Sequence, residues 1–310
     1  MTDSLEFKTQ ETWKRLAERM AEQSWPEACL YVVATPIGNL GDLGLRAWQA
    51  LLRCDAIAAE DTRTSRTLLD AWGVHTPLMA AHRHNENQAA QAIVQRLARG
   101  ERIALVSDAG APAVSDPGAR IVRFVTEAGY RVIPIPGPSA IIAALMASGA
   151  TSDEAPGHVF IGFLPSKAQA RRKALQVWFQ QSLPVVMFES PHRLRACVND
   201  LVSLCAPDRR LTIARELSKR FEQIHTLALR DALGWLDADA HREMGEFVLI
   251  LHPPAPELPG EAGLEGDHVR LMDALLAELS VRDAARVGAA ATGLPRDVLY
   301  AWALRRSDAS

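Results

Sequence analysis

Short apolar runs alternate with polar segments of helical length through the first half of the chain. Each apolar run has the length of a buried strand. This alternation is typical of a mostly parallel sheet that helices cover on both faces. We expect strands near 30–34, 55–59, 103–106 and 130–135, and helices near 43–53, 62–71, 86–99 and 117–128.

A second α/β unit is expected from about 139 to 252. It opens with an apolar helical stretch at 141–146, and we expect its strands near 158–163, 184–189, 211–216 and 246–251. Four prolines and three glycines in residues 253–267 are typical of a linker. Beyond it we expect three helices, of which the last two are spaced as a helix-turn-helix, near 268–279, 281–291 and 296–305. That spacing alone does not establish nucleic-acid binding, because packed helices often adopt it.

These patterns divide the 310 residues into two domains with additions at both ends. The N-terminal segment is polar, with Trp13, Leu16 and Met20 at helical spacing. We predict an N-terminal extension at 1–28, a first α/β domain at 29–137, a second α/β domain at 138–252, a linker at 253–267 and a helical domain at 268–310.

Three loops of small residues follow expected strands. They are TPIGNLGD at 35–42, SDAGAPAVSDPG at 107–118 and PGPSA at 136–140. Small residues let a ligand approach the backbone, and α/β proteins bind ligands at the carboxyl ends of their strands. One such loop alone would suit an ordinary turn, but three together predict one crevice. None of them matches the dinucleotide-binding or P-loop fingerprint.

Eight motifs follow one another over about residues 30–251, namely TPIGNLGD, AAEDTRTSRTLL, SDAGAPAVSDPG, PGPSA, GFLP, FESPHRL, ARELSK and GEFVLI. In this order they resemble the tetrapyrrole methylase superfamily and, within it, the ribosomal RNA small subunit methyltransferase I family. The sequence departs from the family pattern at Ala111, where Thr is usual, and at Met244, where Lys commonly precedes GE. The first departure removes a candidate cofactor hydrogen bond and the second removes a positive charge.

The resemblance implies both a fold and an activity. The fold is two α/β domains of the tetrapyrrole methylase type with the cofactor cleft between them, plus a small C-terminal helical domain. The activity is transfer of a methyl group from S-adenosylmethionine (SAM) to the ribose 2′-hydroxyl of a cytidine in the decoding region of 16S rRNA. The resemblance further implies a homodimer and a substrate in the small ribosomal subunit.

Matching positions in the motifs imply the cofactor contacts. We assign them to Pro36, Gly38, Asp108, Gly110, Val114, Ser115, Asp116, Ser139, Ala140, Phe188, Glu189 and Phe247. For Asp108 and Asp116, capping of a turn is the structural alternative.

A ribose hydroxyl is a poor nucleophile at neutral pH, so a base or a polarising group beside it would help. Charged residues in AAEDTR and ARELSK are the candidates, and we select Lys219, Glu216 and Asp61 as catalytic. A structural ion pair among these groups is the alternative for each of them. Methyl transfer itself requires alignment rather than a metal ion.

The charge of the chain is uneven. Its formal net charge is −3, yet residues 160–225 hold eleven Lys and Arg against five acidic residues. A local basic face is what RNA phosphates require, although a solvated basic surface is the alternative. We expect RNA contacts at Arg63, Arg171, Arg172, Lys173, Arg193 and Arg215.

Other polar residues have structural explanations. The segment 82–86 could contact RNA or act in acid–base chemistry, but we expect it to cap a helix with Asn85 as the N-cap. His82 and His84 lack a third ligand at helical spacing, which disfavours zinc. The four cysteines show no C-x-x-C spacing, which favours free thiols in a reducing cytoplasm over metal ligation. No apolar run approaches membrane-spanning length, and the N-terminus does not look like a secretory signal.

Two other functions stay open at this point. The chain could methylate a tetrapyrrole or another small molecule, although the SDAG…SDPG loop and the basic middle segment favour RNA. It could also be a non-catalytic RNA-binding assembly factor, against which the intact loop glycines weigh.

Overall fold

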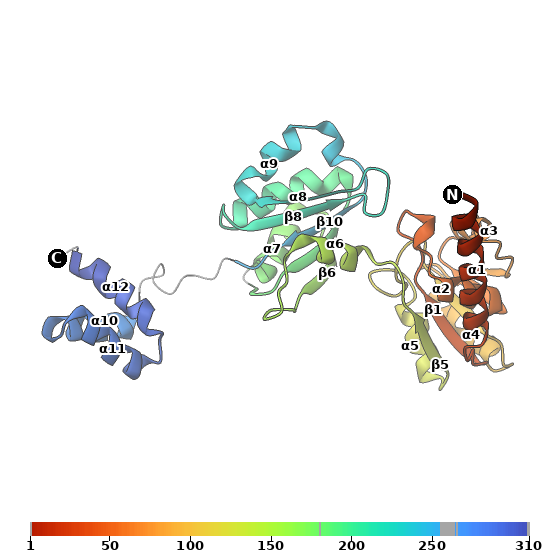
Figure 1. Ribbon diagram of the computed structural model, residues 1–310, viewed down its shortest axis with the longest axis horizontal. Helices are drawn as coiled ribbons and strands as arrows, with labels where there is room; N and C mark the ends of the chain where they lie inside the picture. The colour runs from red at the N-terminus through yellow and green to blue at the C-terminus, as the bar shows by residue number, and fades with distance from the viewer. Residues whose placement is uncertain (1, 180, 255–263, 265, 309–310) are drawn as a thin grey trace. The chain divides into compact units, whose positions relative to one another are not determined.

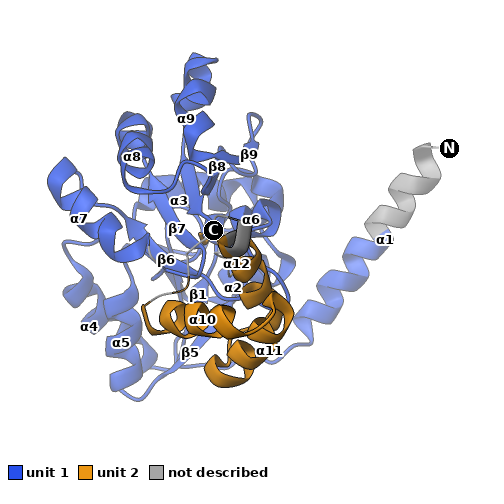
Figure 2. Cartoon of the chain, turned by 90° about the vertical axis from the view of Figure 1, so that its left-hand side faces the viewer, with its two compact units in different colours: residues 1–252 blue, residues 253–310 orange. Residues whose placement is uncertain are grey.

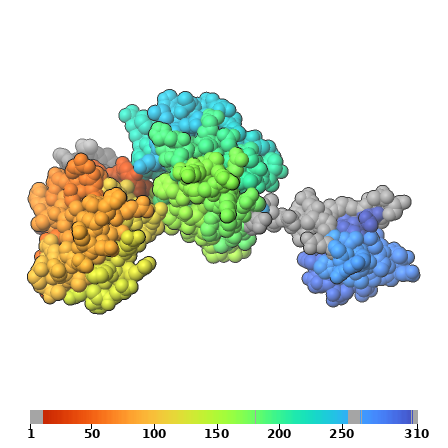
Figure 3. All heavy atoms as spheres, turned by 180° about the vertical axis from the view of Figure 1, so that it is seen from behind, coloured from red at the N-terminus to blue at the C-terminus, as the bar shows by residue number. Residues whose placement is uncertain are grey.

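The computed structural model describes residues 2–179, 181–254, 264 and 266–308. They form two compact units, residues 1–252 and 253–310 (Figure 2). The larger unit holds two five-stranded sheets, and the smaller unit holds three helices (Figure 1). In the space-filling view the two sheets with their helices form two masses, coloured orange to yellow and green to cyan (Figure 3).

The first sheet is parallel throughout, with strand order β3-β2-β4-β1-β5. The four expected strands lie within one residue of their predicted bounds. Sequence reasoning missed β3, which is three residues long and only partly buried. The elements are α1 Thr2–Ala21, β1 Cys29–Val33, η1 Leu40–Asp42, α2 Leu45–Arg53, β2 Ala56–Ala59, α3 Thr62–Ala71, β3 Leu78–Ala80, α4 Glu86–Leu97, β4 Ile103–Val106, α5 Ala119–Glu127 and β5 Arg131–Ile135.

Alternate residues of these strands pack into two different cores. Tyr31 and Val33 of β1 lie in a cluster with residues of α2 and α3, whereas Leu30 lies in a cluster with residues of α4 and α5. Because successive strand side chains point to opposite faces, the helices cover both faces of the sheet, as the alternation predicted. The first helix of the unit, α1, precedes this sheet and contacts α2.

The second sheet is mixed, with strand order β6-β7-β10-β8-β9. Only the β6–β7 pair is parallel among the described pairs. The edge strand β9 was not expected from the sequence, because its apolar and polar residues are all only partly buried or exposed. The elements are α6 Ala140–Ser148, β6 Val159–Phe163, α7 Ala168–Trp178, β7 Val185–Glu189, α8 Pro191–Leu204, β8 Arg210–Arg215, β9 Gln223–Ala228, α9 Leu229–Asp237, η2 Ala240–Glu243 and β10 Phe247–Leu251.

The smaller unit contains α10 Gly266–Glu278, α11 Val281–Thr292 and α12 Arg296–Asp308. Ser280 caps α11, since its hydroxyl oxygen accepts the Asp283 N–H at 3.2 Å. The turn between α11 and α12 passes through Gly293 at φ +73°. Met272 and Leu299 form the centre of a small core. The predicted helical domain is therefore present.

Two smaller expectations also meet the structure. Asn85 stands at the N-cap position of α4, but its side-chain amide donates to the Ala80 carbonyl and makes no cap hydrogen bond, so that part of the prediction is wrong. The four cysteines are free, and Cys205 alone is not fully buried.

No described helix is long and apolar enough to cross a membrane. The predicted domain boundaries stay predictions.

Candidate active site

A cavity of about 400 Å³ lies within the larger unit, where the loops after β1, β4 and β5 meet residues of the second sheet. Its volume falls within the range of small-molecule sites. All three small-residue loops contribute to the lining, so they form one crevice as predicted. The lining residues are Ile37, Ala109, Gly110, Ala111, Val114, Asp116, Ser139, Ala140, Ile141, Phe163, Phe188, Glu189, Ser190, Pro191, Leu217, Glu246, Phe247 and Val248.

Backbone contacts hold the three loops together. Thr35 and Gly110 exchange two hydrogen bonds, of 2.9 Å and 3.0 Å, so the loop after β1 is joined to the loop after β4. Gly110 adopts φ +78°, a conformation that favours glycine. In the third loop, a Cβ added to Gly137 would come 3.1 Å from the Cβ of Ala34. The small residues of the motifs therefore permit close packing of one loop on another.

A buried carboxylate fixes the far end of the loop after β4. Glu86, at the start of α4, is 7% exposed, and its Oε1 accepts the Gly118 N–H at 2.7 Å. Arg120 lies 3.9 Å from its other oxygen. The sequence analysis included this residue in the segment expected to cap α4 and did not link it to the loop. The signal that could have found it is a glutamate in the first turn of a helix, facing a loop that ends in glycine.

Eight of the twelve predicted cofactor residues line the cavity, namely Gly110, Val114, Asp116, Ser139, Ala140, Phe188, Glu189 and Phe247. The other four are Pro36, Gly38, Asp108 and Ser115. Asp108 has a structural contact, because its Oδ1 accepts the Asp61 N–H at 3.1 Å. Ser115 packs near Gly162 of the GFLP motif, where an added Cβ would lie 3.2 Å from its Oγ. Gly38 lies against the stem of Lys219.

The acidic groups beside the cavity repel one another. Burial raises the pKa of Asp116, a hydrogen bond from Ser107 opposes the shift, and the charge of Asp108 adds to it. Burial and then the charges of Asp108 and Asp116 raise the pKa of Glu60. A cation placed beside Asp116 would relieve this repulsion, so the site favours a positively charged ligand.

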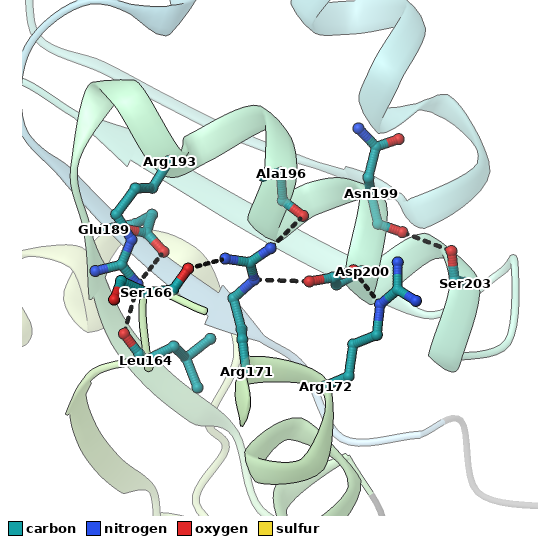
Figure 4. Close-up of polar contacts among 10 residues, drawn as sticks. All are labelled: Leu164, Ser166, Arg171, Arg172, Glu189, Arg193, Ala196, Asn199, Asp200 and Ser203. Atoms are coloured by element: carbon teal, nitrogen blue, oxygen red, sulfur yellow. Dashed lines mark hydrogen bonds and ion pairs between the residues drawn. The ribbon is translucent and has the colours of Figure 1, made fainter. Parts of the chain in front are cut away.

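Glu189 is the second carboxylate of the lining, and its charge is already compensated. Its side chain is fully buried and lies 3.2 Å from Arg193 Nε (Figure 4). It also accepts the Ser190 N–H at 2.8 Å. Of the three lining aromatics, Phe188 packs on Phe163 with ring centroids 5.4 Å apart. This side of the cavity thus offers aromatic surface rather than a free charge.

Lys219 lies between two carboxylates. Its Nζ is 2.9 Å from Glu216 Oε1 and 2.8 Å from Oε2 of Glu246, a lining residue that the sequence analysis did not select. Burial lowers the pKa of Lys219, but the hydrogen bonds to Glu246 and Glu216 outweigh it and raise that pKa. Lys219 therefore stays protonated near neutral pH and is a fixed cation, not a base.

Two glycines leave space for the side chains of Lys219 and Glu216. A Cβ added to Gly38 would lie 2.4 Å from Cγ of Lys219, and one added to Gly245 would lie 2.5 Å from the carboxylate of Glu216. The backbone N–H of Glu246 also donates to Glu216 Oε1 at 2.9 Å. Burial would raise the pKa of Glu216, but the hydrogen bond from Lys219 and that N–H lower it, so Glu216 is an ionised positioning group.

Asp61 takes part in a local structural contact. It is the N-cap of α3, and its Oδ1 accepts the Arg63 N–H at 2.8 Å while Oδ2 lies 2.8 Å from the guanidinium. These hydrogen bonds lower the pKa of Asp61 to about 2. The structural ion pair that was the alternative for this residue is therefore present, and its catalytic role stays a prediction.

The predicted RNA contact at Arg171 is wrong. Arg171 is 4% exposed, and its Nε lies 2.7 Å from Oδ2 of Asp200 (Figure 4). The same guanidinium donates to the Ser166 carbonyl at 3.2 Å. Arg172 is exposed but shares Asp200, with its Nε 2.6 Å from Oδ1. A buried, paired guanidinium stabilises the fold and cannot meet a phosphate.

Contacts within the fold engage other basic side chains of the segment. Arg193 donates to Glu189 and to the Leu164 carbonyl, and Arg215 donates to the carbonyls of Met244 and Phe221. Acidic residues outside residues 160–225 also pair with this segment, since Glu243 lies 2.6 Å from Arg195. Among the described residues, Lys173 is exposed and takes part in no ion pair. Arg63 is exposed beside Asp61.

A parallel sheet joined to a mixed sheet, with a loop-lined cavity, defines a tetrapyrrole methylase. The sequence model of the tetrapyrrole (corrin/porphyrin) methylases matches residues 29–233. The solved structure of a cobalamin biosynthetic enzyme, cobalt precorrin-4 methyltransferase, has a TM-score of 0.54 at 13% identity and covers 72% of this chain and 94% of its own. The solved structure of the methyltransferase CobJ has a TM-score of 0.54 at 18% identity, and the match covers 73% of this chain and 94% of that chain. At these identities the likeness shows the fold alone.

Closer relatives define the family. The protein named ribosomal RNA small subunit methyltransferase I of Pseudomonas aeruginosa is 43% identical over 282 residues, which is 91% of this chain and 98% of that protein. Its namesake in Neisseria meningitidis serogroup B is 44% identical over 275 residues, covering 89% and 92%. The model of the RsmI C-terminal HTH domain matches residues 262–307. The chain belongs to the ribosomal RNA small subunit methyltransferase I family.

Proposed function

We propose that this protein transfers a methyl group from SAM to the ribose 2′-hydroxyl of a cytidine in the decoding region of 16S rRNA. The observation that carries the proposal is the identity of more than two fifths with ribosomal RNA small subunit methyltransferases along almost the whole chain. The cytidine, the hydroxyl and the decoding region come from the family resemblance. The chain's own contribution is the cavity, whose lining suits the cofactor.

The cavity residues fit SAM. Its sulfonium and ammonium groups are cationic, and Asp116 is the lining carboxylate without a basic partner among the described residues. Its adenosine suits the aromatic and apolar wall that includes Phe163, Phe188 and Phe247. Gly110 and Ser139 line the same space and leave room for a ligand close to the backbone. We infer that these residues hold the cofactor.

When bound, SAM supplies an activated methyl group on a cationic sulfur, which leaves as a neutral thioether. The protein has to align the attacking oxygen and to manage one proton. Two of the three N–H groups of Lys219 bond to its two carboxylates, so the third is available to orient a hydroxyl brought beside it. Glu246 is the carboxylate of this cluster that lines the cavity, so it is placed to accept the hydroxyl proton.

We further propose that the protein acts as a cytoplasmic homodimer on the small subunit. The exposed side of α6 supports the dimer, because Met146 is 83% exposed and Ile142, one turn away, is also exposed. A helix that is apolar on all sides normally packs against a partner. Light scattering should give twice the chain mass, and a monomer at micromolar concentration would contradict this part of the proposal.

The direct test is methyl transfer to purified subunits. Small subunits from cells without this modification are incubated with methyl-labelled SAM and the protein, and nuclease digests are analysed for 2′-O-methylcytidine. We expect one label per subunit. Gly110→Val is the matched control, because it fills the cavity wall and should transfer none. Label on a base, on protein or on no component of the subunit would refute the proposal.

A further inference from the structure

An aromatic side chain and a cation are displayed together on the turn between β8 and β9, residues 216–222. Phe221 is 64% exposed, and the guanidinium carbon of Arg220 lies 5.5 Å from the centroid of its ring. Exposing a Phe side chain forgoes the stabilisation that burial gives. The turn therefore presents apolar surface that the fold itself does not use.

This turn has one fixed, strained conformation. Glu216 and Ser218 are non-glycine residues with φ +51° and +67°. The Ser218 N–H donates to Glu222 Oε2 at 2.6 Å, and Arg215 donates to the Phe221 carbonyl at 3.1 Å. Strain of this kind persists where the surroundings impose it, and it concentrates at functional sites. Phe221 is thus held in place rather than left on a loose loop.

The same turn borders the candidate active site. Leu217 lines the cavity, and Lys219 holds Glu246 at its edge. The preceding strand β8 pairs with β10, where Arg215 lies opposite Phe247 of the lining. Arg220 is exposed and forms no ion pair with any residue that the structure describes, whereas Lys219 beside it is fully paired. Arg220 therefore offers a cation free of ion pairs next to the site, whereas the Glu222 carboxylate of the same turn accepts the Ser218 N–H.

We propose that Phe221 and Arg220 bind the RNA nucleotide next to the one that is methylated. An unpaired base stacks on the Phe221 ring, and the Arg220 guanidinium contacts the adjoining phosphate. Proteins recognise unpaired RNA by stacking splayed bases on aromatic side chains and by placing cations along the backbone. The complementary charge and the fixed ring favour this partner. The inference rests on the proposed function, since it requires an RNA substrate at this cavity.

The test compares binding of unmodified small subunits with binding of SAM. Phe221→Ala should weaken subunit affinity about tenfold or more, because one base stack is lost. Affinity for SAM, measured by calorimetry, should not change. Phe221→Trp should bind the subunit about as tightly as the parent, because Trp also offers an aromatic face. A merely structural role for Phe221 would not predict this recovery. Phe124→Ala, at a residue of α5 that is 40% exposed and outside the lining, is the matched control.

Ultraviolet cross-linking of the parent protein, with mass spectrometry of the peptide that holds residue 221, then identifies the partner. We expect a nucleotide of 16S rRNA. A cross-link to a ribosomal protein would overturn the inference. So would a Phe221→Ala protein that binds the small subunit like the parent, or one that no longer forms a dimer. If the parent methylates subunits and only the variant result fails, this inference alone is wrong. If the parent itself transfers no methyl group, the proposed function fails with it.

Discussion

Replacing Glu86 by alanine should loosen the cofactor loop without touching the cavity lining. Its carboxylate is buried and accepts the Gly118 N–H at 2.7 Å. A buried N–H that loses its partner costs about 1–3 kcal/mol. We therefore expect the free energy of unfolding to fall by about 2 kcal/mol. For a unit of this size, that corresponds to a melting temperature lower by about 4–8 °C.

The same change should weaken SAM binding, because Gly118 ends the loop that supplies Gly110 and Asp116 to the lining. Calorimetric melting and SAM titration measure the two effects. Glu86→Gln keeps an acceptor oxygen and should recover most of both. Glu127→Ala, at an exposed acid on α5, should change neither. A Glu86→Ala protein that melts and binds like the parent would refute this role.

Three further predictions concern the site and its support. Gly110→Val should abolish SAM binding in a folded protein, since a β-branched residue at φ +78° is strained and its side chain enters the cavity; calorimetry with unchanged affinity would contradict this. Lys219→Ala should slow single-turnover methyl transfer about 10–100-fold with SAM affinity intact, and Lys219→Arg should recover part of the rate because the charge is kept; a parental rate in Lys219→Ala would remove it from the mechanism. Arg171→Ala should lower the free energy of unfolding by about 1.5–3 kcal/mol, because Asp200 loses its buried partner and keeps only Arg172; Arg172→Ala, measured by the same denaturant titration, should lower it less, because Arg172 is exposed.

The sequence predicted the elements that local patterns determine. Buried strands such as 103–106 are continuous apolar runs. The loops after such strands contain glycines at positions where a larger side chain would crowd a neighbouring segment. These features are local, so they revealed the fold class and most of the cavity lining. Partly buried edge strands such as β9 have no such pattern and were missed.

The roles of charged residues could not be predicted in the same way. Arg171 and Asp200 are far apart in sequence and meet only because α7 packs on α8. A count of charges therefore predicted a basic face where the fold forms a buried ion pair. Glu246 was missed for the same reason, since its link to Lys219 depends on the pairing of β8 with β10. Tertiary pairing decides which charges remain available to a substrate.

The central claim is tested most directly in cells. Ribose methylation of small-subunit rRNA is mapped by mass spectrometry in the parent strain, in a strain without this gene, and in that strain carrying the Gly110→Val form. We predict that one 2′-O-methylcytidine in the decoding region disappears on deletion and does not return with the variant. An identical methylation map with and without the gene would contradict the account.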